Sequence, residues 1–168
     1  MRTFCFQFYN NSLSVGARLK ARHAAGGLNI DDRCSFCIKS GYAVPGRETF
    51  IHLFYECPLL IPVRDLFIRT FLSDTNNERT RKMLCVAGCD IAGSASNNFF
   101  ILMTSIFYNY TIWQSRHKKI VPSFATVCYE IDNHFDNAVT CSNYVKELAT
   151  ENVTPICRRW RERHTRRG

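Results

Sequence analysis

The sequence lacks the local motifs that identify the common enzyme classes. It has no glycine-rich phosphate-binding loop, no nucleophile elbow and no HExxH motif. The adjacent carboxylates Asp31 and Asp32 have no aromatic residue before Ile30 and lie in a loop, so we interpret them as loop-solvating or helix-capping residues rather than as a polymerase pair. Without polymerase or endonuclease motifs, we expect no catalysis by this chain alone.

Long apolar segments are also missing. The N-terminal stretch MRTFCFQFYNNSLSVG has neither the apolar core nor the small-residue cleavage site of a signal peptide. Residues 91–115 carry no charge, but they include ten Ser, Thr, Asn and Gln side chains, too many for the roughly 20 residues that cross a bilayer. We therefore predict a buried helix in this window, no membrane partner and an intracellular location.

The charge of the chain is concentrated at its two ends. The formal net charge is +8, of which residues 1–39 contribute +4, residues 40–156 contribute −1 and residues 157–168 contribute +5. This distribution is typical of a protein that binds a polyanion, and nucleic acid is the commonest such partner. For the C-terminal segment CRRWRERHTRRG, a solvated tail without a partner is the alternative.

Nine cysteines are present, and four potential metal ligands fall within 24 residues. In a reducing compartment, clustered Cys and His indicate metal binding rather than disulfides. The spacing is Cys34-x2-Cys37-x14-His52-x4-Cys57, and two thiolates at i and i+3 can bind one tetrahedral zinc at about 2.3 Å each. Four protein ligands leave no coordination position open for water, so such a site is structural.

The metal assignment has an alternative at this point, and the sequence contains a second, weaker candidate. A cysteine-rich chain produces a CxxC by chance, and His52 is then an ordinary core histidine. The Cys85-x3-Cys89 pair is a weaker second candidate with no histidine nearby, and we interpret both thiols as small buried or loop residues.

Apolar periodicity predicts a mainly α fold. Helical spacing is found at 2–20, in a short helix from Glu48, at 62–72 and 99–119, and again from Phe124 to Leu148. We predict a small Cys3His zinc module with short helices packed on a C-terminal pair of long antiparallel helices. The predicted units are residues 1–85 (N-terminal helix plus zinc-binding module), 86–150 (helical hairpin region) and 151–168 (basic, flexible tail).

Several segments resemble the zinc-binding region that follows the reverse transcriptase of non-LTR (LINE-type) retrotransposons. They are RTFCFQFYNNSL, CSFC, ETFIHLFYECP and the IW pair at 112–113, and the resemblance extends from the N-terminus to Lys119, about two-thirds of the chain. It implies zinc bound by Cys34, Cys37, His52 and Cys57. It also implies the C-terminal part of a larger polyprotein, or a remnant of one, in the nucleus or in a cytoplasmic ribonucleoprotein.

The resemblance further implies that the domain helps the reverse transcriptase core of the same element to hold template RNA and target DNA. We expect RNA to be favoured over DNA. The candidate nucleic-acid-binding residues are Arg18, Lys20, Arg22, Arg116, Lys118, Lys119, Arg158, Arg159, Trp160, Arg161 and Arg163. The alternatives are a structural zinc or protein-interaction module, and a degenerate element remnant without independent activity.

Overall fold

The computed structural model describes residues 2–9, 12–27, 29–72, 81–82, 85–86 and 95–139. Within these ranges the chain is mainly α-helical and has no β-strand; an isolated antiparallel bridge joins Arg33 to Arg47. The predicted mainly α class is therefore confirmed for this part of the chain. The predicted tail at 151–168, Cys89 and residues 140–148 lie outside the described residues.

The N-terminal region contains two helices where the sequence predicted one. Helix α1 (Arg2–Tyr9) and helix α2 (Gly16–His23) are separated by a segment whose described residues, 12–15, are not helical, so a single helix over 2–20 is wrong. Val15 has φ −68° and ψ 153°, and both Leu13 and Val15 are buried. The Val15 N–H donates to the Leu13 carbonyl at 2.9 Å in a tight turn, and burial of the two apolar side chains in this non-helical segment outweighs the local helical pattern.

The central region consists of short elements. After a 3-10 turn (η1, Ala24–Gly26) come helix α3 (Ser35–Lys39), the π-type turn η2 (His52–Glu56), helix α4 (Ile61–Phe67) and a second π-type turn, η3 (Ile68–Leu72). Pro62 lies in the first turn of α4, where the missing amide hydrogen bond costs nothing. These short elements need packing partners, because helices of this length are not stable alone.

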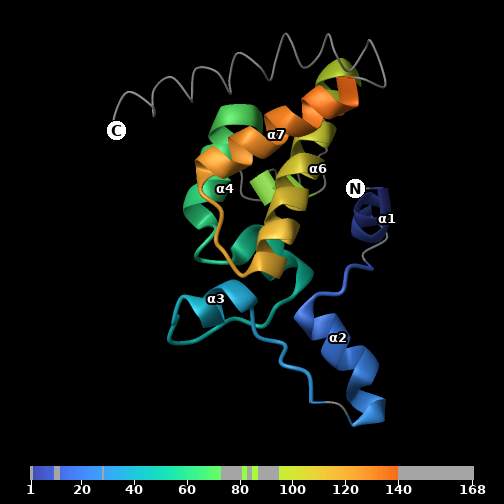
Figure 1. The fold of residues 1–168 in the computed structure, drawn as a ribbon, viewed down its shortest axis with the longest axis vertical. Coiled ribbons are helices and arrows are strands. Elements are labelled where there is room, and N and C mark those ends of the chain that lie inside the picture. The colour runs from blue at the N-terminus through green and yellow to red at the C-terminus, as the bar shows by residue number, and fades with distance from the viewer. Residues whose placement is uncertain are drawn as a thin grey trace.

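The C-terminal described region contains α6 (Ala95–Lys118) and α7 (Phe124–Val139). Pro122 separates them, and Ser123 caps α7 by accepting the Thr126 N–H at 3.1 Å. In Figure 1, α7 turns back across α6, and the two helices are in contact. The full length of the second helix lies partly outside the described residues, so the pair of long antiparallel helices stays a prediction.

Helix α6 forms the centre of the core. Its Tyr110 ring lies 5.2 Å from Phe4 of α1, and its Tyr108 ring stacks 4.1 Å from Phe67 of α4. On the α7 side, Phe107 meets Phe135 edge-on at 4.9 Å. Buried residues of the central region and of α1, α6 and α7 form one continuous cluster. The domain boundary predicted after residue 85 stays a prediction.

Within the charge-free window, residues 95–115 belong to α6, and the part from residue 101 onward is largely buried, as predicted. Thr104, Ser105, Asn109 and Thr111 are buried within α6, and Asn109 donates to the Cys85 carbonyl at 2.9 Å. Thr111 Oγ1 likewise donates to the Phe107 carbonyl at 2.9 Å, and hydrogen bonds of this kind to protein atoms let a helix carry polar side chains in its buried part. Among the helices that the structure describes, none combines the length and apolar character needed to cross a membrane.

Candidate metal centre

The four candidate ligands are brought together by two short helical elements. Cys34 precedes α3 and Cys37 lies inside it; His52 is the first residue of η2 and Cys57 follows its last residue. The Cys57 N–H donates to the His52 carbonyl at 2.7 Å, a bond spanning five residues. An ordinary α-helix would rotate Cys57 about 140° away from His52, whereas this wider turn returns it to the same side.

Pro58 stabilises the end of this turn. The residue before a proline is excluded from the α region by steric clash, and Cys57 accordingly has φ −60° and ψ 119°. The π-type turn therefore ends at Glu56. The position of Pro58 in the sequence predicted that Cys57 would leave the helical path.

Backbone pairing joins the two halves of the site. The Cys34 N–H donates to the Gly46 carbonyl at 2.8 Å, and the Glu48 N–H donates to the Asp32 carbonyl at 2.6 Å. These bonds flank the Arg33–Arg47 bridge and align the two segments antiparallel. These backbone hydrogen bonds therefore hold the CxxC turn and the His52 turn side by side without help from a metal ion.

Three of the six separations between the donor atoms match those of a tetrahedral site. The sulfurs of Cys34 and Cys57 lie 3.9 Å apart, those of Cys37 and Cys57 lie 3.7 Å apart, and the Cys37 sulfur lies 3.6 Å from His52 Nε2. All four donor atoms lie within 4.8 Å of one another. Zinc–sulfur bonds of about 2.3 Å and zinc–nitrogen bonds of about 2.0 Å, arranged tetrahedrally, separate the sulfurs by about 3.8 Å and sulfur from nitrogen by about 3.6 Å.

The same distances exclude disulfide bonds within the site. Bonded sulfurs are about 2.05 Å apart, and all three cysteines are free. The three cysteines are buried, and His52 is half-buried. The Cys3His group could hold a metal ion with all four ligands supplied by the protein.

The pKa of each thiol in the site depends on the other two thiols. Hydrogen bonding with Cys57 lowers the pKa of Cys34 to about 4, whereas the same interaction raises the pKa of Cys57. Burial, followed by the charge on Cys34, raises the pKa of Cys37. Negative charges on closely spaced buried sulfurs repel one another, so a divalent metal ion would stabilise the thiolate forms that the site alone disfavours.

Backbone amides add to this stabilisation. Hydrogen bonds from the backbone of Cys37 to Cys34, of Gly46 to Cys37 and of Leu59 to Cys57 each lower the pKa of the accepting thiol. Amide donors around a thiolate are the electrostatic support that a cysteine-rich metal site requires. The arrangement is therefore suited to a bound cation by its backbone as well as by its ligands.

Gly46 supports the imidazole of His52. A Cβ atom at position 46 would lie 2.5 Å from His52 Cε1 and 2.7 Å from Nδ1. The ring therefore packs directly on the glycine backbone, and any larger residue there would displace it. Because Gly46 lies between the two pairs of ligands, it fixes the ring in the position where Nε2 lies 3.6 Å from the Cys37 sulfur.

We expect Gly46→Ala to weaken metal binding by roughly 10–100-fold, the usual effect of disturbing a group that orients a ligand. The measurement is competition with a zinc-binding dye. Gly26→Ala is the matched control, because its added Cβ would meet no atom within 4 Å. Equal affinities for the two variants would contradict the role assigned to Gly46.

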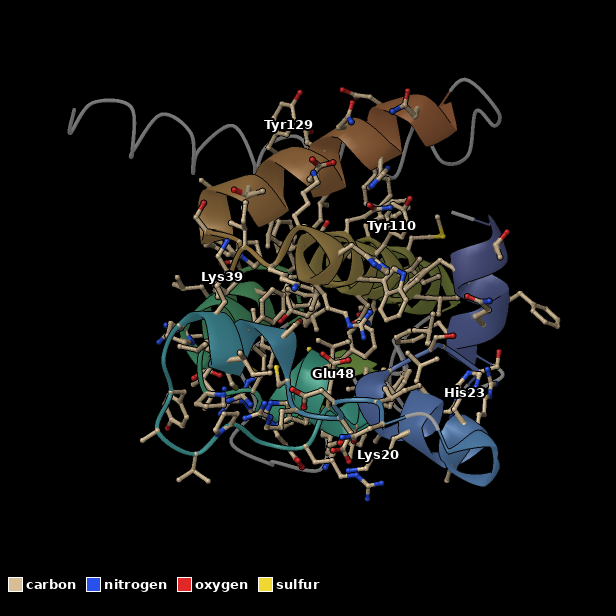
Figure 2. The ribbon with its side chains drawn as sticks, turned by 60° about the horizontal axis from the view of Figure 1, so that its bottom comes forward. Lys20, His23, Lys39, Glu48, Tyr110 and Tyr129 are labelled. Carbon is tan, nitrogen blue, oxygen red and sulfur yellow. The ribbon has the colours of Figure 1, made fainter. Side chains whose placement is uncertain are left out.

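The buried carboxylate of Glu48 connects the metal centre to the rest of the fold. It is 1% exposed and accepts the Gly16 N–H at 2.9 Å and Nε of Arg116 at 2.9 Å. Its other oxygen accepts the Ser35 N–H at 3.3 Å, directly after the first ligand. Trp113 lies 4.9 Å from the Arg116 guanidinium as a cation–π partner. Figure 2 shows Glu48 between α3 and α2.

Sequence reasoning missed this role of Glu48. The residue forms part of the ETFIHLFYECP block, but its partner Arg116 is 68 positions away. The available signal was an acidic residue that follows Arg47 and precedes an apolar run, and this signal does not identify a partner. Arg116, which we predicted to bind nucleic acid, forms an internal ion pair with Glu48, and its contact with nucleic acid stays a prediction.

The predicted cations of α2 differ in their surroundings. Arg18 is half-buried and donates to the Leu13 carbonyl at 3.4 Å. Lys20 pairs with Asp32 at 3.0 Å but stays exposed, and Arg22 is exposed. Asp32 also pairs with Arg47 at 2.8 Å, so this carboxylate forms ion pairs with two cations of the chain.

The predicted cations of α6 lie at its C-terminal end. Lys118 and Lys119 are both exposed, whereas Arg116 is largely enclosed beside Glu48. Lys119 has φ 54°, and the chain leaves the helix at this residue. The remaining candidates lie outside the described residues: Arg158, Arg159, Trp160, Arg161 and Arg163.

Cys85 belongs to the hydrophobic core. It is completely buried, with its sulfur 4.0 Å from the Phe54 carbonyl, and burial raises its pKa to about 12. Within the described part of the chain, it joins no group of three or more potential ligands. Metal binding by a Cys85–Cys89 pair remains untested because Cys89 lies outside the described residues.

Comparison with known proteins identified no relative of the chain. No protein-family model matches the chain, and no curated protein and no solved structure matches it. A functional assignment therefore depends on the site itself and on the residues around it.

Proposed function

We propose that the chain is a nucleic-acid-binding domain, with RNA favoured, organised by one structural zinc ion. The observation that carries this proposal is the set of donor separations: 3.7 and 3.9 Å between sulfurs and 3.6 Å from sulfur to imidazole nitrogen. Zinc accepts thiolate and imidazole ligands in a tetrahedral arrangement without a redox step. The ion would cross-link the CxxC turn to the His52–Cys57 turn.

The charge distribution supports a polyanionic partner. The chain carries a net charge of +8, and exposed cations lie on α2 and at the end of α6. These two regions adjoin, because Arg116 also donates to the Ser14 carbonyl at 3.4 Å, immediately before α2. Neighbouring positive groups on one surface strengthen the attraction for a phosphate backbone.

The sequence resemblance supports a more specific proposal. By it, the domain is an accessory to the reverse transcriptase core of a non-LTR retrotransposon, holds template RNA and target DNA, and has no catalytic role. The block ETFIHLFYECP, which provides this resemblance, also contains His52, Cys57 and the buried Glu48. In this proposal the domain acts in a nuclear or cytoplasmic ribonucleoprotein beside the polymerase.

We expect the affinity for single-stranded RNA to fall linearly with salt on a double logarithmic plot. The slope should be about −0.7 for each phosphate contacted, because binding releases condensed counterions. Fluorescence anisotropy with a labelled RNA, repeated over a range of salt concentrations, measures this slope. Arg22→Ala should reduce the magnitude of the slope by about 0.7, the contribution of one phosphate contact. Arg69 is an exposed arginine on η3, and Arg69→Ala should leave the slope unchanged.

A protein-interaction module is the second candidate. It is favoured by exposed apolar side chains on and after α3, namely Ile38, Tyr42 and Val44, of which Val44 is 78% exposed. Docking through such side chains depends weakly on salt. Absence of RNA binding together with salt-insensitive association would reject the nucleic-acid proposal and favour this one.

A further inference from the structure

A basic cleft lies beside the metal centre. It has a volume of about 450 Å³, within the range of small-ligand sites. Residues of α2, of α3 and of the end of α6 line it, together with the segment before Cys34. Its charged lining consists of four cations and two carboxylates: Arg33, Lys39, Arg116, Lys119, Asp31 and Glu48.

The charges of the cleft are only partly balanced. Arg33 pairs with Asp31 at 2.7 Å, and Arg116 pairs with Glu48. Among the described residues, no carboxylate forms an ion pair with Lys39 or Lys119. The cleft therefore has two excess positive charges on exposed ammonium groups, and an ammonium is a point charge suited to a phosphate.

The cleft also has apolar walls. Leu19 of α2 and Ile38 of α3 contribute to its lining, and Ile38 is 41% exposed. A bare inorganic anion makes no use of such surface, whereas the sugar and base of a nucleotide do. Figure 2 shows Lys39 on α3 and Glu48 nearer the centre of the same face.

We propose that this cleft binds one nucleotide unit of a nucleic-acid strand, with its phosphate on Lys39 and Lys119 and its sugar and base against Leu19 and Ile38. This inference rests on the proposed nucleic-acid function and identifies the cleft as one site of contact with the strand. The buried Glu48–Arg116 pair holds α6 against the zinc module, so the cleft depends on the metal-organised fold. Lys39 was not among the cations selected from the sequence.

The test compares two double variants of the full chain that have the same net charge. Lys39→Ala/Lys119→Ala removes the two cleft ammonium groups. Arg69→Ala/Lys82→Ala removes two cations that neither line the cleft nor belong to the candidate nucleic-acid-binding residues. Because the net charge is equal, a difference between the variants reports a local contact rather than the overall field. Circular dichroism confirms that both are folded.

We expect the cleft variant to bind a short single-stranded RNA about tenfold or more weakly, with a salt slope reduced by about one phosphate, and the control to retain both values. Equal RNA binding by the two variants overturns the cleft assignment and leaves the nucleic-acid function standing. Tighter binding of polyglutamate than of RNA at the cleft also overturns it.

A second titration separates the cleft from the proposed function. Adenosine monophosphate and inorganic phosphate are each added to the wild-type chain and to the cleft variant, with binding followed by NMR. Mononucleotide binding that is tighter than phosphate binding and lost in the cleft variant supports the cleft even when the chain binds no RNA. Equal binding of phosphate and nucleotide overturns the role of Leu19 and Ile38.

Discussion

Cys57→Ser protein is expected to lose its zinc and to unfold roughly 10 °C below the wild-type chain. A ligand at a thousandfold its Kd stabilises the folded state by about 4 kcal/mol, and each kcal/mol shifts Tm by about 2–4 °C in a chain of this length. Cys57 is a suitable site for the change because its sulfur contacts both other sulfurs of the group. Elemental analysis of protein purified under reducing conditions gives the zinc content, and calorimetry gives Tm.

Cys5→Ser is the matched control for this experiment. Cys5 is a half-buried thiol on α1 outside the ligand group, so its loss should leave one zinc per chain. Chelation of the wild-type protein provides a route without mutation: Tm should fall by a similar amount and return when zinc is restored. Metal-free wild-type protein with an unchanged Tm would contradict the zinc assignment.

The ligand set is the part of the molecule that the sequence predicts best. The short gap between Cys34 and Cys37 and the proline after Cys57 are local features, and local features restrict backbone geometry directly. The structure brings the four donor atoms together as the spacing predicted. The identity of the ion as zinc stays a prediction that follows from ligand chemistry.

Features that depend on distant residues were not predictable from local patterns. The helical spacing of Phe6, Tyr9 and Leu13 favoured one helix over 2–20, but Leu13 and Val15 are buried in non-helical backbone. The Glu48–Arg116 pair joins positions 68 residues apart. Tertiary packing overrides local propensity in the first case, and in the second no periodicity identifies the partner.

Glu48→Gln is expected to destabilise the fold by about 3–5 kcal/mol, because it leaves the largely enclosed guanidinium of Arg116 without its counter-charge. The substitution keeps the shape of the side chain, so the loss is mainly electrostatic. Urea denaturation measures the free energy of unfolding. Glu56→Gln is the control: Glu56 pairs with Lys82 on the exposed surface, where such pairs contribute at most about 1 kcal/mol.

A double-mutant cycle identifies the source of this effect. Arg116→Met alone leaves a buried carboxylate without its counter-charge, and Glu48→Gln alone leaves a buried cation without one. The sum of the two single losses of unfolding free energy should therefore exceed the loss in the double variant. The zinc content of folded Glu48→Gln protein should remain one per chain, because neither Glu48 oxygen belongs to the ligand group. A loss below about 0.5 kcal/mol for Glu48→Gln would contradict the linking role, whereas loss of stability with retained zinc would show that the ion pair joins the metal module to α6.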